Sequence, residues 1–187
     1  RSLRPAPRPA HPLMPRPNPF APPRPALILR NRQQARPVDL RLLRRIVLHL
    51  LAHHFRPATY ELGVFLVGAR EMASVNERFL QHTGSTDVIT LDYGDAEPSK
   101  NLCGDIFICV DEAVLQARRF RTTWEAEVVR YLAHALLHLQ GLDDLNPADY
   151  RRMKQAENRL LKQIGKEFSI GSLGVRPPAR PHKPASA

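Results

Sequence analysis

The sequence predicts an α+β fold, in which a small mixed β-sheet of about four strands is combined with about five helices. Apolar side chains recur at helical spacing in the longer segments, while shorter segments alternate in polarity or are rich in β-branched residues. The two kinds of segment are unevenly mixed along the chain. Its 187 residues are enough for one domain with a substantial core.

Strands and helices alternate in the first part of the folded region. Residues 26–30 (ALILR) are predicted to form a short strand, and residues 60–67 (YELGVFLV) a second one. Each strand is followed by a helix, over residues 38–55 and 69–80, because apolar side chains recur there every three or four positions.

Three histidines lie on the helix predicted over residues 38–55. His49 and His53 are four residues apart and could in principle share a metal ion, but no third ligand follows within useful range. We therefore expect these two residues and His54 at the surface or at the edge of the core.

Two further strands precede the remaining helices. Residues 86–93 (TDVITLDY) carry several β-branched side chains, and residues 104–110 (GDIFICV) form an apolar run that begins with a glycine. A short helix is predicted over residues 111–120.

The last two helices have recognisable ends. Thr122 and Glu125 have the spacing of a capping box at the start of one helix, and Gly141 is placed to end it. The Asn-Pro pair at residues 146–147 suits the start of the other helix, which is predicted to stop at Gly165. The buried stripe of this helix is expected to contain Met153, Leu160, Leu161 and Ile164.

The positive charge of the chain belongs to its two ends. The formal net charge is +10, but residues 1–37 contain eight arginines and no acid, and residues 171–187 add three basic side chains. These eleven charges exceed the total by one, so residues 38–170 carry a net charge of −1. A domain close to neutrality gives no general electrostatic attraction for nucleic acid.

Composition divides the chain into three predicted regions. Ten prolines lie within residues 1–25, and proline fixes φ and lacks the N–H donor that helices and sheets need. We predict a disordered, proline- and arginine-rich basic arm (residues 1–25), a folded domain (residues 26–168) and a disordered basic tail (residues 169–187). The arm is either a solvated extension or a loose RNA-attracting segment.

Several classes of protein are excluded by composition. The chain has no run of 18 or more apolar residues and no short apolar region after its basic start, so we expect neither a membrane span nor secretion. Its two cysteines, Cys103 and Cys109, form no C-x-x-C pair, which favours a reducing compartment.

The segment HALLHLQGLDD, residues 134–144, predicts a metal site. His134 and His138 are one helical turn apart, and Gly141 permits a sharp turn that can return Asp144 beneath both rings. Three protein ligands leave a position open for chemistry. Metzincin peptidases need a glutamate base directly after the first histidine, and this chain has Ala135 there. The sequence therefore argues against a metallopeptidase.

This segment resembles the YbeY family of bacterial metal-dependent endoribonucleases, whose motif ends in a third histidine where this chain has Asp144. Residues 75–93 (VNERFLQHTGSTDVITLDY) are similar to the family's asparagine-led segment and its threonine–aspartate–valine strand, and residues 104–109 (GDIFIC) resemble its glycine–aspartate–isoleucine strand. Met153 and Glu157 match the methionine and glutamate of its last helix. The resemblance covers roughly residues 26–165.

The resemblance implies one divalent metal ion, zinc in the first instance, held by His134, His138 and Asp144. Asp143 is the alternative carboxylate, and an aspartate ligand would shift selectivity toward harder ions such as manganese. Glu157 is expected either to support a ligand histidine or to serve as a cap or ion-pair partner.

Three further polar residues lie near the predicted strands. Asp87 and Asp105 are expected to have structural roles at the edges of strands. His82 lies in a loop from which it could face the cleft, and no role is predicted for it.

By the same resemblance, we expect a single-strand-specific, metal-dependent endoribonuclease that acts in ribosomal RNA maturation and ribosome quality control. It would hydrolyse phosphodiesters with a metal-activated water. The expected partners are ribosomal RNA and the small ribosomal subunit or its associated proteins, with no membrane, in the bacterial cytoplasm.

The alternative is a catalytically weakened, ribosome-associated binding module of the same fold. The family usually has an arginine where this chain has Leu80, and Arg78 would point elsewhere on a helix.

Overall fold

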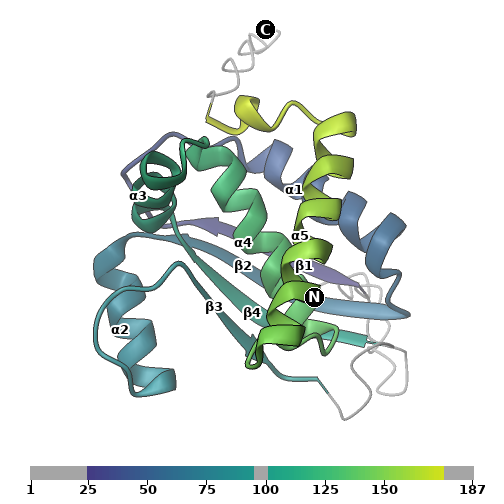
Figure 1. Cartoon of the computed structure of the whole chain (residues 1–187), viewed down its shortest axis with the longest axis horizontal. Helices are drawn as coiled ribbons and strands as arrows, with labels where there is room; N and C mark the ends of the chain where they lie inside the picture. The colour runs from purple at the N-terminus through teal and green to yellow at the C-terminus, as the bar shows by residue number, and fades with distance from the viewer. Residues whose placement is uncertain (1–24, 95–100, 175–187) are drawn as a thin grey trace, which may run out of the picture.

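The computed structural model describes residues 25–94 and 101–174, which form a four-stranded sheet with helices packed on it (Figure 1). The strands are β1 (Ala26–Asn31), β2 (Thr59–Val67), β3 (Val88–Asp92) and β4 (Asn101–Cys109), in the spatial order β1-β2-β4-β3. β1, β2 and β4 are parallel, and β3 is antiparallel to β4. The predicted α+β class with a small mixed sheet is therefore confirmed.

The described residues contain five α-helices, the number expected from the sequence. Their bounds are α1 (Leu40–Leu50), α2 (Ala69–Leu80), α3 (Val110–Phe120), α4 (Trp124–Leu139) and α5 (Pro147–Glu167). A π-helix (Leu51–Phe55) continues α1, and a short 3₁₀-helix (Ile170–Gly174) follows α5.

The core lies mainly between one face of the sheet and helices α1, α4 and α5. Helix α4 is its centre, since residues such as Leu132 and Leu136 are completely buried and α4 contacts β3, β4, α3 and α5. Side chains alternate along a strand, so Ile106 enters this core while Phe107 faces the opposite side of β4. There it packs with Met72 of α2 in a smaller cluster.

Helix α4 is therefore fixed by packing on most of its surface. Ten of its residues are buried, and one strip, which includes His134 and His138, remains partly accessible. This arrangement holds the two histidines on a rigid element.

Two predictions about helix ends need correction. The N-cap of α4 is Thr123, whose side chain accepts from the N–H of Ala126, and Thr122 instead donates to Glu127, so the predicted capping box is wrong by one residue. Helix α5 passes Gly165 and ends at Glu167. A single glycine costs a helix about 1 kcal/mol, and the buried contact of Ile164 opposes that cost.

The disordered tail was predicted to begin too early. Residues 170–174 form the 3₁₀-helix, Leu173 is fully buried, and its carbonyl accepts from the N–H of Asp39. The rest of the predicted tail (175–187) and nearly all of the predicted arm (1–24) lie outside the described residues. Within the described part of the chain, no helix is long and apolar enough to cross a membrane.

Candidate metal centre

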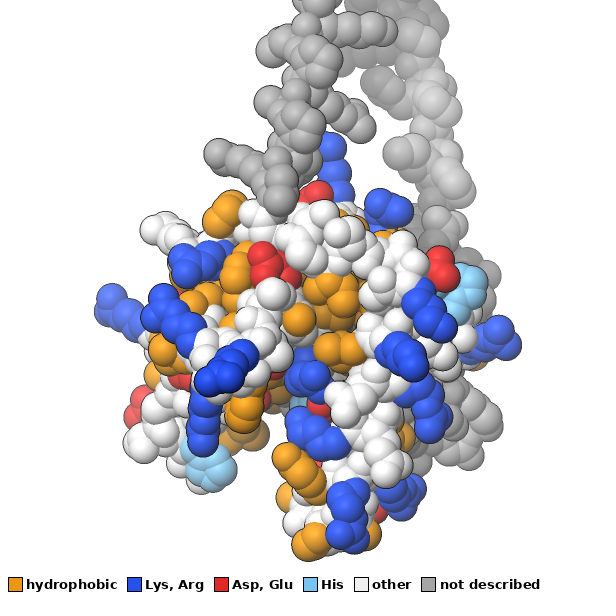
Figure 2. Space-filling view, turned by 45° about the horizontal axis from the view of Figure 1, so that its top comes forward, with side chains coloured by type: hydrophobic (Ala, Val, Ile, Leu, Met, Phe, Trp, Pro, Cys, Tyr) orange, Lys and Arg blue, Asp and Glu red, His pale blue; other side chains and the backbone are white. Residues whose placement is uncertain are grey.

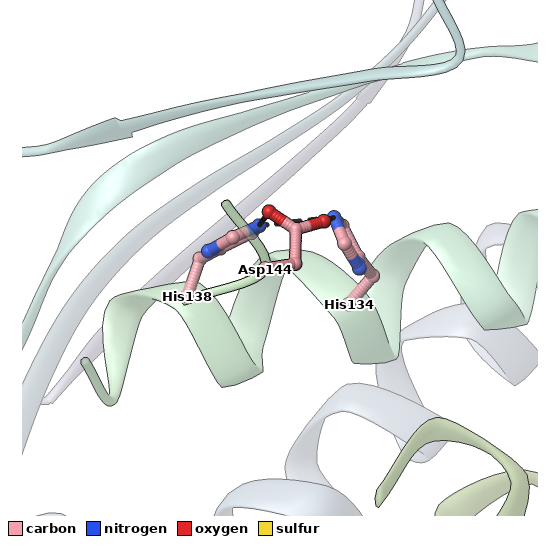
Figure 3. A group of neighbouring side chains, drawn as sticks. All are labelled: His134, His138 and Asp144. Atoms are coloured by element: carbon pink, nitrogen blue, oxygen red, sulfur yellow. Dashed lines mark hydrogen bonds and ion pairs between the residues drawn. The ribbon is translucent and has the colours of Figure 1, made fainter. Parts of the chain in front are cut away.

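The end of helix α4 and the loop after it bring three side chains together (Figure 3). His134 and His138 project from successive turns of α4, which ends at Leu139. Gly141 then adopts a positive φ of 82°, a conformation that glycine reaches without a Cβ penalty. The chain reverses there, and Asp144 returns toward the two rings as the spacing predicted.

The three side chains face one another closely. Nε2 of His138 lies 3.0 Å from Nε2 of His134, and the Asp144 carboxylate oxygens lie 3.8 Å from His138 Nε2 and 3.9 Å from His134 Nε2. One potential ligand atom from each residue falls within 4.8 Å of the other two. Within residues 25–94 and 101–174, this is the single group of three such side chains with that geometry.

The outer nitrogen of each ring is held by an acceptor. Nδ1 of His138 lies 2.9 Å from the carbonyl oxygen of Leu142, and a carbonyl can only accept, so this Nδ1 carries the proton. Nδ1 of His134 lies 2.9 Å from Oε1 of Glu157 and donates to that carboxylate in the same way. In the neutral rings, both Nε2 atoms therefore present lone pairs to the same point.

Two lone pairs 3.0 Å apart repel each other unless a cation lies between or beside them. Two imidazole nitrogens and one carboxylate oxygen also form a donor set that zinc and other divalent ions accept. The residues present thus fit a divalent metal ion.

Glu157 joins the centre to the interior of the protein. Its side chain is completely buried, and it accepts from His134, from Arg130 at 3.2 Å and from Lys154 at 3.1 Å. Burial alone would raise the pKa of Glu157, but the hydrogen bond with His134 and the charge of Lys154 hold that pKa below its ordinary value. The carboxylate therefore stays ionised and able to accept the His134 proton.

The alternative ligand, Asp143, has a different role in the structure. Its Oδ1 accepts from the N–H groups of Asp144, at 2.7 Å, and Leu145, at 3.3 Å. It thereby stabilises the turn that positions Asp144. It does not belong to the group formed by the two histidines and Asp144.

The remaining histidines named in the sequence analysis lie elsewhere. The ring centroids of His49 and His53 are 4.5 Å apart, and His49 also contacts the ring of Phe168. These residues and His54 form no metal-binding group in the described regions. His82 is exposed in the loop after α2.

Asp87 and Asp105 contact neighbouring strand residues. Asp87 accepts from the N–H of Val88 at 2.9 Å, at the start of β3, and Asp105 accepts from the hydroxyl of Tyr93 at 3.3 Å. Leu80, at the end of α2, is 44% exposed and supplies no cation.

A groove that the sequence analysis did not predict adjoins the centre. It has a volume of about 650 Å³ and is formed by side chains of α3, α4 and α5, including Arg130 and Lys154, which contact Glu157. Figure 2 shows the molecule hollowed between two lobes at the lower edge of the view, with Lys and Arg side chains on both sides. The available sequence signal was that Arg130 precedes His134 by four residues and so shares its helix face.

Comparisons with known proteins agree on one family. Residues 28–165 match the model of the family described as Endoribonuclease YbeY. A protein of that name from Chlorobium luteolum is 37% identical over 129 residues, which are 69% of this chain and 91% of the relative. Another, from Anaeromyxobacter sp., is 39% identical over 108 residues, 58% of this chain and 56% of the relative.

A solved structure shares the fold. The solution structure of TM1509 from Thermotoga maritima aligns with a TM-score of 0.58 at 20% identity, covering 83% of this chain and 99% of that one.

Proposed function

The chain belongs to the Endoribonuclease YbeY family, and we propose that it cleaves RNA with a divalent metal ion held by His134, His138 and Asp144. The observation that carries this proposal is the paired orientation of the two imidazoles. Leu142 and Glu157 fix the protons on the outer nitrogens, so the inner nitrogens present lone pairs to one point beside a carboxylate.

The metal ion and the side chains would have different roles in the reaction. When bound, a divalent ion supplies a Lewis acid for a phosphoryl oxygen and lowers the pKa of a water molecule. His134, His138 and Asp144 would hold the ion, and Glu157 keeps the His134 ring in the required tautomer. Ala135 provides no carboxylate base beside the first histidine, so the side chains contribute orientation and charge.

The expected metal is zinc, with manganese as the alternative. Zinc accepts imidazole nitrogen and carboxylate oxygen at similar distances. Asp144 adds an anionic oxygen where the family motif has a histidine, and oxygen ligands favour harder ions. The proposed site holds one ion, because the described residues offer a single converging set.

The proposed substrate is single-stranded ribosomal RNA, cleaved during its maturation and in ribosome quality control in the bacterial cytoplasm. This part of the proposal rests on the family resemblance. The small ribosomal subunit or its associated proteins would then be the partners.

The second candidate function is RNA or ribosome binding without efficient cleavage. It is favoured by Leu80, which replaces the arginine usual in the family and leaves no cation at that position. The two functions share the fold and the metal site and differ in turnover.

RNA cleavage by the purified full chain tests the proposal. We expect single-stranded RNA to be cut in the presence of zinc or manganese, the cutting to stop with a chelator, and activity to return when metal is restored. The His138→Ala variant should be inactive, while His49→Ala, which changes a histidine outside the site, should retain activity. Metal binding without cleavage would favour the binding module, and cleavage that survives both the chelator and His138→Ala would overturn the proposal.

A further inference from the structure

The groove beside the metal centre combines cations with exposed aromatic rings. Its cationic side chains are Arg119 of α3, Arg130 of α4 and Lys154 of α5. Phe120 and Tyr150, which are 61% and 50% exposed, also line it. Each ring has a cation near one face, with Arg119 5.4 Å from the centroid of Phe120 and Lys154 5.6 Å from that of Tyr150. Aromatic rings and cations side by side form the kind of surface on which nucleic-acid bases stack.

The groove and the metal centre share one buried carboxylate. Oε1 of Glu157 accepts from His134, whereas Oε2 accepts from Arg130 at 3.2 Å. Arg130 and His134 are also four residues apart on α4. A strand lying in the groove would therefore reach the proposed metal position within about one helical turn.

The acidic side chains of the groove are already engaged. Asp87 accepts from the N–H of Val88 and from the hydroxyl of Thr86, and Glu127 accepts from the hydroxyl of Thr122. Arg119 has no ion pair or hydrogen bond among the described residues. Arg130 uses one terminal nitrogen for Glu157 and Asn158, and its Nε lies 3.7 Å from Oε2 of Glu127, which leaves its second terminal nitrogen without a partner in the same part of the chain. Cationic donors are thus left facing the groove.

The floor of the groove holds a polar atom without a partner. The hydroxyl of Tyr131 is buried, with the residue 5% exposed, and makes no hydrogen bond within the part of the chain described. Burial, together with the nearby charges of Asp87 and Glu127, raises the pKa of Tyr131, so the hydroxyl keeps its proton. A buried O–H donor of this kind is costly unless a ligand or a water molecule accepts from it.

We propose that this groove binds the single-stranded RNA segment next to the scissile bond, with bases stacked on Phe120 and Tyr150 and phosphates bound by Arg119 and Arg130. The inference rests on the proposed nuclease function and adds the route of the substrate. Arg130 then supplies, from α4, a cation that Leu80 does not supply from α2. Stacking on exposed rings requires unpaired bases, so the groove selects single strands over duplex.

The test is binding of a fluorescent single-stranded RNA of about ten nucleotides to the metal-loaded full chain in the cold, with cleavage followed in parallel. Phe120→Ala and Tyr150→Ala should each weaken binding on the order of tenfold, because base stacking accounts for much of the affinity at such sites. Arg119→Glu should weaken RNA binding by a similar factor. It should also make binding less dependent on salt, because the loss of one phosphate contact lowers the slope of log affinity against log salt by roughly 0.7.

Matched controls lie on the same helix. Leu115 is 55% exposed and Arg118 is exposed, and neither lines the groove. Leu115→Ala and Arg118→Glu should bind the RNA with wild-type affinity. Phe120→Tyr, which keeps an aromatic ring, should bind it more tightly than Phe120→Ala and close to the wild type. Metal content should be equal in all of these variants, because none of them touches the histidines or Asp144.

Two outcomes would overturn the inference. Groove variants that bind RNA as well as their controls would show that the strand lies elsewhere, while leaving metal-dependent cleavage by the wild type intact. Equal affinity of the wild type for a duplex of the same sequence would also contradict it. Absence of RNA cleavage by the metal-loaded wild type is a different result, since it contradicts the proposed function itself.

Discussion

Oε1 of Glu157 on α5 lies 2.9 Å from Nδ1 of His134 on α4, although the two residues are 23 positions apart in the sequence. Packing of α5 against α4 therefore determines the orientation of a proposed metal ligand. The carboxylate is buried with Lys154 and Arg130 as its other partners, so the same residue contributes to the interior and to the site.

Replacing Glu157 should weaken metal binding without removing the ligands. We expect Glu157→Gln to lower the affinity for zinc by about 10–100-fold, since the His134 ring loses its ionic acceptor. Zinc titration against a competing chelator measures this. The control is Glu167→Gln, an exposed acid at the end of the same helix, and an unchanged affinity in Glu157→Gln would show that Glu157 does not support His134.

Asp144 and Asp143 should respond differently to the same substitution. Asp144→Asn removes a proposed anionic ligand and should reduce affinity by more than the roughly 10–100-fold expected for a supporting residue. Asp143→Asn should have little effect, because an asparagine oxygen can still accept from the N–H groups of Asp144 and Leu145. Asp144→His should keep binding and shift preference toward zinc.

Metal titrations of these three variants decide the assignment. Loss of metal in Asp143→Asn with retention in Asp144→Asn would place the ligand one residue earlier.

The segment after α5 should contribute to stability. Leu173 is fully buried, so Leu173→Ala should cost about 2–5 kcal/mol of unfolding free energy, as for other buried leucines. Leu115→Ala, at an exposed position, should cost less than about 0.5 kcal/mol. Urea denaturation of the two variants compares these costs, and equal stability would mean that the 3₁₀-helix is not held against the domain.

Deletion of residues 1–24 should leave the melting temperature nearly unchanged. The segment is rich in proline and contains no acid, a composition that supplies little to a core. Any loss of RNA affinity on deletion should be large at low salt and disappear as salt rises, because it would come from arginine–phosphate contacts. A large drop in melting temperature would show instead that the segment packs on the domain.

The local part of the site was predictable from the sequence. The spacing of His134 and His138, with Gly141 before Asp144, depends only on helix period and on one glycine turn, and the structure brings these residues together. The spacing of the family motif favours Asp144 over Asp143. In the structure Asp144 lies beside the two rings, whereas Asp143 is hydrogen-bonded to the turn, which supports the proposal that Asp144 is the ligand.

Features that depend on packing between elements could not be predicted in the same way. The groove needs α3, α4 and α5 to be placed relative to one another, and the contact of Glu157 with His134 needs α5 to lie along α4. The helix start was misplaced because Thr122 and Thr123 are both good caps. The buried side chain of Glu127, which accepts from Thr122, leaves Thr123 as the cap.

The most direct measurement is the metal content of the purified full chain, determined by mass spectrometry after zinc loading and removal of excess ion. The account predicts about one zinc ion per chain in the wild type and in His49→Ala, and almost none in the double variant His134→Ala/His138→Ala, because a single carboxylate cannot hold the ion. Full occupancy in the double variant would contradict the proposed centre and, with it, the chemical basis of the proposed nuclease.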